Sequence, residues 1–233
     1  MLQYSYDENK YTYEISIDEV GRGCMFGDVV VASTILPKHC NFDISNIKDS
    51  KKFTSKTKLY NESENIKQNA LHYHIASLSN TIIDEVNILQ AVMLGMHKCI
   101  DSSIEYLQHI TNNNLDYSKI LLVIDGNYFN PYFTSDGTQI DHITVKQGDG
   151  KYVGIAAASI LAKTGRDKDI YDLCEKYPLL KTYYNIHKNV GYGAKVHMDG
   201  IRQYGITTMH RKSFGICKTS ELNEVIYTTE KIS

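Results

Sequence analysis

The chain carries two adjacent carboxylates followed directly by a glycine-rich turn, in the segment Ile17-Asp18-Glu19-Val20-Gly21-Arg22-Gly23. The residues from Tyr13 to Ile17 are mostly β-branched or aromatic, which predicts a strand that ends near the two acids. Neighbouring strand residues point to opposite faces, so both carboxylates reach one site only if the chain bends there, and the glycines supply that bend. Carboxylates bind hard divalent cations, and backbone amides with an arginine bind phosphate. The segment therefore indicates metal-dependent chemistry on a phosphate ester.

The same pattern also has a less specific interpretation. An acidic pair before a glycine turn is often only the solvated end of a strand. The glycines do not form a dinucleotide-binding loop, because Phe26 stands where the last glycine of G-x-G-x-x-G is required, and no G-x-x-x-x-G-K-[ST] phosphate loop occurs in the sequence. From this motif alone, a catalytic site and a solvated strand end both remain open.

The composition is that of a folded chain of about one domain. Of its 233 residues, 42% are hydrophobic and 22% are charged, which suffices to fill a core and argues against disorder. The longest apolar runs, such as residues 154–162, are too short to span a bilayer, and the first residues lack the basic and apolar regions of a secretory signal. The five cysteines form no C-x-x-C pair, which disfavours a structural zinc site and favours a reducing compartment. We therefore expect a cytoplasmic protein without membrane contact.

The charge balance gives a divided indication about nucleic acid. The net charge is −2, whereas nucleic-acid-binding domains are usually basic. The sequence nevertheless has a local basic segment, in which one acid, Asp49, is accompanied by Lys48, Lys51, Lys52, Lys56 and Lys58. This segment is either a phosphate-facing loop or a solvated loop that leads into a helix.

The spacing of apolar residues predicts an α/β protein. Strands are expected near residues 13–17, 28–36, 71–78, 119–124 and 142–146, and helices near 56–68, 86–107, 153–176 and 196–204. Ser50 and Thr54 are candidate helix N-caps, and Gly205 is expected to end the last helix.

Two further acids follow predicted strands. Asp125 ends the apolar run that begins at Ile120, and Asp149 lies in the turn after residues 142–146. A buried strand that delivers a carboxylate at its C-terminal end is the usual arrangement for a site on an α/β sheet. If these strands are neighbours, Asp18, Glu19, Asp125 and Asp149 converge on one edge. Two divalent ions roughly 3.5–4 Å apart would offset their repulsion and serve phosphoryl displacement.

Motifs along nearly the whole chain, from residue 13 to about 215, resemble type 2 ribonuclease H, the ribonuclease HII family. They are Asp18-Glu19-Val20-Gly21-Arg22-Gly23, Asp49-Ser50-Lys51-Lys52, residues 83–91, Asp125-Gly126-Asn127, Lys146-Gln147-Gly148-Asp149, residues 156–163 with Arg166-Asp167, Gly191-Tyr192-Gly193 and His210-Arg211-Lys212-Ser213-Phe214. Each motif alone is modest, but all eight occur in the family's order.

The resemblance implies a ribonuclease H-like fold, with a mixed five-stranded sheet flanked by helices and a helical C-terminal part. It implies a catalytic domain over residues 1–190, with residues 191–233 as a helical segment packed on it rather than an independent domain. The expected enzyme is a monomeric, metal-dependent endoribonuclease. Its expected substrates are RNA–DNA hybrids and duplex DNA that contains single ribonucleotides, and its expected cofactors are two ions of Mg²⁺ or Mn²⁺.

The resemblance also assigns residues to roles. Asp18, Glu19, Asp125 and Asp149 correspond to the catalytic metal ligands. Gly21, Arg22 and Gly23 correspond to the loop that recognises a ribose 2′-hydroxyl through its backbone, and Tyr192 corresponds to the tyrosine that stacks at the nucleotide after the ribonucleotide. The residues expected to line the phosphate track or brace the site are Lys51, Lys52, Ser159, Lys163 and Arg166.

Some positions depart from the family pattern. Cys24-Met25-Phe26 replaces the usual proline and small residue after Gly-Arg-Gly, and Ala194 stands where threonine is common. Neither change affects the four acids. His197 and His210 are candidate proton donors, although such residues are more often structural or contact substrate.

Two rival functions remain. A DNA junction nuclease or transposase-like enzyme shares the acidic cluster but is not expected to combine Gly-Arg-Gly with Gly-Tyr-Gly. A binding subunit that has lost catalysis is disfavoured because all four acids are present.

Overall fold

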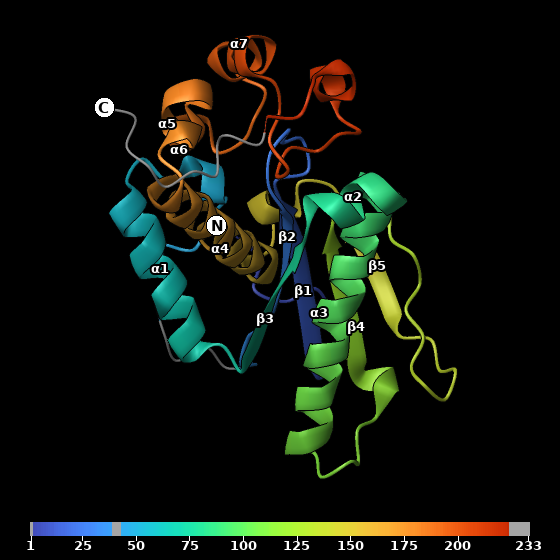
Figure 1. Cartoon of the computed structure of the whole chain (residues 1–233). Helices are drawn as coiled ribbons and strands as arrows, with labels where there is room; N and C mark the ends of the chain where they lie inside the picture. Colours follow the sequence, from blue (N-terminus) through green and yellow to red (C-terminus); the bar gives the residue numbers. More distant parts are fainter. Residues whose placement is uncertain (1, 39–42, 224–233) are drawn as a thin grey trace. The chain divides into compact units, whose positions relative to one another are not determined.

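The computed structural model describes residues 2–38 and 43–223, and they contain one mixed sheet of five strands in the order β3-β2-β1-β4-β5 (Figure 1). The strands are β1 (Tyr13–Val20), β2 (Val29–Ile35), β3 (His72–Leu78), β4 (Ile120–Asp125) and β5 (Asp141–Val145). β1 pairs antiparallel with β2 and parallel with β4, and β4 pairs parallel with β5.

The helices follow the predicted order, with additions near the C-terminal end. They are α1 (Lys56–Asn69), α2 (Asn80–Val86), α3 (Ile88–Ile110), α4 (Val153–Lys176), α5 (Leu179–Tyr184), α6 (Ile186–Asn189) and α7 (Lys195–Tyr204), with short 3-10 turns η1 (Ser50–Lys52), η2 (Tyr117–Lys119), η3 (Gly148–Gly150) and η4 (Gly215–Thr219). None of these helices combines the length and hydrophobicity needed to cross a membrane. The predicted mixed five-stranded sheet flanked by helices, with a helical C-terminal part, is confirmed.

The chain divides into two compact units. The first contains Met1–Val20, Val30–Ala76 and Met93–Thr164, and the second contains Gly21–Val29, Ser77–Val92 and Gly165–Ser233. The expected division into a catalytic domain over 1–190 and a C-terminal segment over 191–233 stays a prediction.

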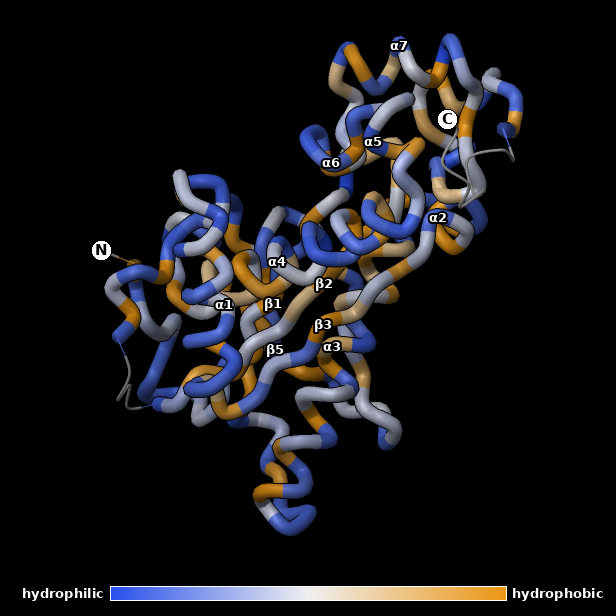
Figure 2. Tube along the Cα trace, turned by 60° about the vertical axis from the view of Figure 1, so that its left-hand side comes forward, coloured by the Kyte–Doolittle hydropathy of each residue, from blue (hydrophilic) through white to orange (hydrophobic). Residues whose placement is uncertain are grey.

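Strand β2 has a helix layer on each side within the first unit. Val30 and Ala32 belong to the core cluster that contains buried residues of α1 and α4. On the opposite face, the Ser33 hydroxyl lies 3.1 Å from that of Ser103 on α3. This alternation is what a strand buried on both faces requires, and it explains the continuous apolar run of β2. Figure 2 shows hydrophobic residues concentrated around β1 and α4.

The second unit has its own core. Its buried side chains include Phe26, Ile170, Leu180, Tyr184 and Ile201, and all five are at most 2% exposed. Phe26 belongs to the segment that replaces the family's proline and small residue, so that departure contributes to packing.

Two local predictions were wrong. The helix expected over 86–107 is broken at Asn87, whose φ of 70° interrupts α2 and whose side chain then accepts the N–H groups of Leu89 and Gln90 to begin α3. The caps near residue 50 also lie one residue from the predicted positions. Asp49 caps η1 and Ser55 caps α1, rather than Ser50 and Thr54.

Candidate active site

The parallel register of β1 and β4 sets Asp18 beside Asp125. The paired positions run from Tyr13 and Ile120 to Ile17 and Ile124, so Asp18 and Asp125 are the next step on the two strands. Both strands run in the same direction, and both acids lie at C-terminal ends of the central part of the sheet. In-register neighbours on parallel strands share a face, so the two carboxylates share one side of the sheet.

Asp18 is buried on the face that packs against α4. Its side chain is 5% exposed, accepts a hydrogen bond from the Ser159 hydroxyl, and accepts the N–H of Glu19 at 2.7 Å. The strand stays regular through Val20, where it still pairs with Val30, and the chain turns only after the two acids, at Gly21, whose φ is +93°. By alternation Glu19 therefore starts on the opposite face, although its charge still acts on Asp18.

The turn η3 brings Asp149 into the same neighbourhood. The backbone N–H of Gly148 donates to Asp125 Oδ1 at 2.6 Å. A Cβ atom at position 148 would lie 3.2 Å from that oxygen and 2.4 Å from Ile155 Cδ1, so only glycine brings the backbone this close. Asp149 follows directly and is 7% exposed.

The carboxylates repel each other. Burial raises the pKa of Asp18 well above its ordinary value, and the charges of Asp125 and Glu19 raise it further. The pKa of Asp149 is also raised, first by burial and then by the charge of Asp49, while Lys51 opposes the shift. The uncharged acid form is favoured because the negative charges face each other in a poorly hydrated place.

The basic segment lies against this acidic cluster, within the first unit. Lys51 Nζ is 3.7 Å from Asp149 Oδ2, and Lys52 Nζ is 3.9 Å from Asp49 Oδ2. The Ser50 and Ser159 hydroxyls are 3.0 Å apart, and since Ser159 gives its proton to Asp18, Ser50 is the donor between them. Asp49 thus acts on the cluster as a further negative charge. In the sequence Asp49 is the one acid among the lysines, and its place in the motif Asp49-Ser50-Lys51-Lys52 is the signal that links it to the site.

The donor set suits a hard divalent cation. Asp18, Asp125 and Asp149 offer carboxylate oxygens, which such cations prefer, and Lys51 is the cation paired with one of them. Among the residues described, however, no three His, Cys, Asp or Glu side chains are gathered closely enough to form a ready-made metal site. The residues therefore fit a divalent ion by the chemistry and charge of their side chains.

The glycine loop belongs to the second unit and is held by two buried arginines. Arg166, 1% exposed, donates to the carbonyls of Asp28, Phe26 and Val190 at 2.9, 3.0 and 2.7 Å. Arg211 donates to the carbonyls of Gly27 and Arg22 at 2.9 and 3.1 Å. Gly21 has a φ of +93°, and a Cβ there would lie 2.3 Å from Arg166 Nε. Arg166 therefore braces the loop, and sequence reasoning had singled out only Arg166 of this pair.

The outer part of the loop is open. Arg22 and Gly23 are exposed, and nothing lies within 4 Å of where a Cβ of Gly23 would be. Such a bare backbone permits close approach by a ligand.

Tyr192 pairs with this loop through an antiparallel bridge to Cys24. Its side chain is 44% exposed, and burial of the remainder raises the pKa of its phenol. Gly191, with a φ of +87°, admits no side chain, because a Cβ there would lie 2.6 Å from the Phe26 carbonyl oxygen. The glycines beside Tyr192 thus allow a partly exposed ring to sit directly against the loop.

The remaining predicted residues lie on α4. Ser159 is 2% exposed and touches Asp18 and Ser50 as described, so it supports the acids rather than facing solvent. Lys163 is half-buried one turn further along.

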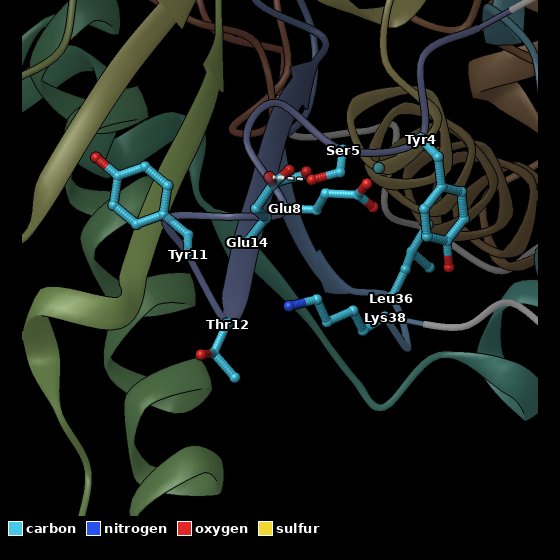
Figure 3. Close-up of a pocket in the computed structure, with 10 residues that line it drawn as sticks. Tyr4, Ser5, Glu8, Tyr11, Thr12, Glu14, Leu36 and Lys38 are labelled. Atoms are coloured by element: carbon cyan, nitrogen blue, oxygen red, sulfur yellow. Dashed lines mark hydrogen bonds between the residues drawn. The ribbon is translucent and has the colours of Figure 1, made fainter.

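A separate small hollow in the first unit lies near the opposite end of β1 (Figure 3). Glu14 there accepts hydrogen bonds from the Ser5 hydroxyl at 2.5 Å and from the N–H groups of Tyr6 and Asp7 at 2.8 and 3.1 Å. The Glu14 carboxylate thus holds residues 5–7 against strand β1. The polar groups that line this hollow therefore serve to attach the N-terminal residues to the sheet.

A mixed five-stranded sheet with carboxylates at the ends of its central parallel strands defines the ribonuclease H-like class of fold. Two solved structures share it. Ribonuclease H2 from Pyrococcus horikoshii has a TM-score of 0.62 and 20% identity, over 89% of this chain and 96% of that chain. The structure of the PCNA:RNase HII complex from Archaeoglobus fulgidus has a TM-score of 0.59 and 20% identity, over 87% of this chain and 95% of that chain.

Sequence comparison is more specific. The ribonuclease HII family model matches residues 15–217. Ribonuclease HII of Bacteroides thetaiotaomicron is 41% identical over 215 residues, which cover 92% of this chain and 96% of the relative. Ribonuclease HII of Cytophaga hutchinsonii is 41% identical over 201 residues, covering 86% and 88%.

The chain belongs to the ribonuclease HII family. It is therefore a ribonuclease H-type endonuclease, of an enzyme class that depends on divalent metal ions and acts on RNA in RNA–DNA hybrids. The resemblance inferred from the motifs is confirmed, and both rival functions are superseded.

Proposed function

We propose that this enzyme cleaves single ribonucleotides embedded in duplex DNA as well as longer RNA in hybrids, and leaves 5′-phosphate and 3′-hydroxyl ends. The observation that carries the proposal is the register of β1 and β4, with Asp18 and Asp125 as neighbours and Gly148 bonded to Asp125 at 2.6 Å. This supports a hydrolytic centre built from carboxylates, and the glycine loop that follows β1 supports recognition of ribose.

In this proposal Asp18, Glu19, Asp125 and Asp149 hold two divalent ions, Mg²⁺ or Mn²⁺. When bound, such ions supply activation of a water nucleophile and stabilisation of the leaving oxygen. The Gly148 N–H and the Ser159 hydroxyl fix the orientations of Asp125 and Asp18. The raised pKa values of Asp18 and Asp149 support this role, because a cation relieves the repulsion that causes part of each shift.

The substrate contacts follow from exposure and shape. Lys51 and Lys52, both exposed, bind phosphates of the nucleic acid. The bare backbone at Gly21, Arg22 and Gly23 contacts the 2′-hydroxyl, the group that distinguishes RNA from DNA. Tyr192 stacks on the nucleotide after the ribonucleotide.

On α4, Ser159 and Arg166 hold protein groups in place, and Lys163 lies along the phosphate track. The corresponding biological roles are ribonucleotide excision repair and removal of replication primers, carried out in the cytoplasm by a monomer.

The test is cleavage of three matched duplexes, with one ribonucleotide in DNA, with a continuous RNA strand on DNA, and with DNA only. Each is incubated with Mg²⁺, with Mn²⁺ and with chelator, beside Asp125→Asn as the inactive control. We expect metal-dependent cutting of the first two duplexes and none of the third. Cutting of the hybrid alone would refute the proposal for embedded ribonucleotides, and cutting without metal would refute the proposed chemistry.

Tyr192→Ala tests the proposed stacking of Tyr192 on the nucleotide after the ribonucleotide. An aromatic stack on a base is worth about 1–3 kcal/mol, so kcat/KM on the single-ribonucleotide duplex should fall about ten- to a hundredfold. The loss on the RNA tract should be smaller, because other registers remain productive there. Equal losses on the two substrates would show that Tyr192 does not recognise the junction.

A further inference from the structure

Two histidines whose roles the sequence left open form a buried chain of hydrogen bonds in the second unit. His197 and His210 are both 0% exposed, and their Nε2 atoms are 3.1 Å apart. His197 Nδ1 lies 2.8 Å from the carbonyl oxygen of Tyr192. At the other end, His210 Nδ1 lies 2.9 Å from the backbone nitrogen of Thr207 and 3.0 Å from its hydroxyl.

The partners determine which nitrogen carries each proton. The Thr207 N–H is a donor, so His210 Nδ1 is an acceptor and its proton sits on Nε2. The Thr207 hydroxyl accepts the Met209 N–H at 3.1 Å and is free to donate to the same Nδ1. His210 Nε2–H then donates to His197 Nε2, which places the proton of His197 on Nδ1, facing the Tyr192 carbonyl. The chain therefore has one direction, from Thr207 through both rings to Tyr192.

This arrangement works only with both rings uncharged. A second proton on either ring would set a donor against a donor, at Thr207 or between the two Nε2 atoms. The surroundings agree, since the His210 ring packs edge-on to Phe26 and against Tyr184, with centroids 5.1 and 5.0 Å away. Burial also lowers the pKa of both histidines.

The hydrogen-bond chain ends at Tyr192, directly after a segment with a strained backbone. Val190 has a φ of 43° and Gly191 a φ of 87°, both in the left-handed region, immediately before Tyr192. The Tyr192 carbonyl accepts two donors, His197 Nδ1 and the Ala194 N–H, each at 2.8 Å. Fixing this carbonyl fixes the peptide that carries the exposed Tyr192 ring.

We propose that His197 and His210 are positioning residues that set the Tyr192 ring, and are not proton donors to the substrate. The inference rests on the proposed function, in which Tyr192 stacks beside the ribonucleotide. It accounts for two fully buried imidazoles beside a partly exposed aromatic side chain.

Two substitutions of His197 distinguish its hydrogen bond to Tyr192 from its hydrogen bond to His210. The amide nitrogen of asparagine takes the place of Nδ1, so His197→Asn keeps the donor to Tyr192 and loses the contact with His210. His197→Gln places its amide near Nε2, so it keeps the contact with His210 and loses the donor to Tyr192. We expect His197→Gln to lower kcat/KM on the single-ribonucleotide duplex by roughly three- to tenfold relative to the RNA tract, the effect of one hydrogen bond. His197→Asn keeps the donor to Tyr192 but loses the support of His210, so its ratio of the two substrates should lie between those of wild type and His197→Gln.

A double substitution tests whether the effect passes through Tyr192. In the Tyr192→Ala background, His197→Gln should cause no further change in the substrate ratio. A merely structural histidine would lower activity on both substrates alike and would do so in either background. Equal ratios for His197→Gln and His197→Asn would therefore overturn the inference.

A measurement without catalysis completes the test. Nitrogen NMR of the histidine rings in the wild-type protein should find His210 protonated on Nε2 and His197 on Nδ1 at neutral pH. The opposite tautomer at His210 would overturn the inference even if the variants fold poorly. If Tyr192→Ala leaves the substrate ratio unchanged, the proposed role of Tyr192 fails and the inference fails with it. If Tyr192→Ala changes the ratio and His197→Gln does not, only the inference fails.

Discussion

Replacement of Gly148 by alanine should damage the site through a clash that the structure locates. The added Cβ would lie 2.4 Å from Ile155 Cδ1 and 3.2 Å from Asp125 Oδ1. Either Ile155 must leave its buried position or the turn must move away from Asp125, which strains the 2.6 Å hydrogen bond from the Gly148 N–H. Both responses affect a residue that we propose as a metal ligand.

The expected change in the free energy of unfolding combines an overpacking cost and a gain from restricting the unfolded chain. Overpacking a filled core costs about 1–3 kcal/mol. Alanine also gains about 0.4–1 kcal/mol over glycine by restricting the unfolded chain. Gly150 lies in the same turn and has nothing within 4 Å of an added Cβ, so Gly150→Ala carries the same gain without the clash. We expect Gly148→Ala to be about 1–3 kcal/mol less stable than Gly150→Ala, a difference in Tm of roughly 2–12 °C.

Activity should fall more steeply than stability. A displacement of about 1 Å at a reacting centre costs about a hundredfold in rate, so Gly148→Ala should lose most of its kcat while Gly150→Ala keeps its own. Urea unfolding and hybrid cleavage of the two variants give both quantities. Ile155→Val removes the Cδ1 atom that clashes, so adding it to Gly148→Ala should recover part of the lost stability. Equal behaviour of the two alanine variants, or no recovery in the double variant, would refute the reasoning.

Three further predictions concern charge. Asp125→Asn should abolish cleavage, and turnover near that of wild type would remove Asp125 from the site. The substitution also removes one negative charge that raises the pKa of Asp18. It should therefore raise Tm slightly when metal is absent. Alanine at both Lys51 and Lys52 should make the log–log salt dependence of hybrid binding shallower by roughly one unit per lost phosphate contact, and an unchanged slope in a titration from low to high salt would identify the segment as a solvated loop. Burial lowers the pKa of His210 from 6.5 to about 3, so the unfolded chain takes up a proton first as the pH falls. The contribution of uncharged His210 to stability is complete above about pH 6.5 and declines toward about pH 3. In urea unfolding, the stability advantage of wild type over His210→Asn should therefore shrink by about 2 kcal/mol between pH 7 and pH 5. An advantage that grows as the pH falls would contradict the assignment.

The sequence alone determined the features that depend on local pattern. The apolar runs predicted the five strands and most helices, because burial on one or both faces dictates the residues of an element. The strand-terminal acids indicated phosphoryl chemistry, because carboxylates are the side chains that bind hard divalent cations. The glycines around Arg22 supported it, because a residue without a side chain leaves its backbone open to a ligand. Asn87 was missed, since its break of the helix rests on one positive φ within a continuous apolar pattern.

The tertiary structure decided which of these residues meet. The register of β1 with β4 makes Asp18 a neighbour of Asp125, and pairing between segments a hundred residues apart leaves no local signal. The sequence left open whether Arg166 lines the phosphate track or braces the site. Its donors go to the carbonyls of Phe26, Asp28 and Val190, because a guanidinium can bind phosphate or backbone equally well and only the fold supplies the partner. His197 and His210 are ordinary histidines in the sequence. They become a directed hydrogen-bond chain only because packing removes water from both rings and leaves each nitrogen a single kind of partner.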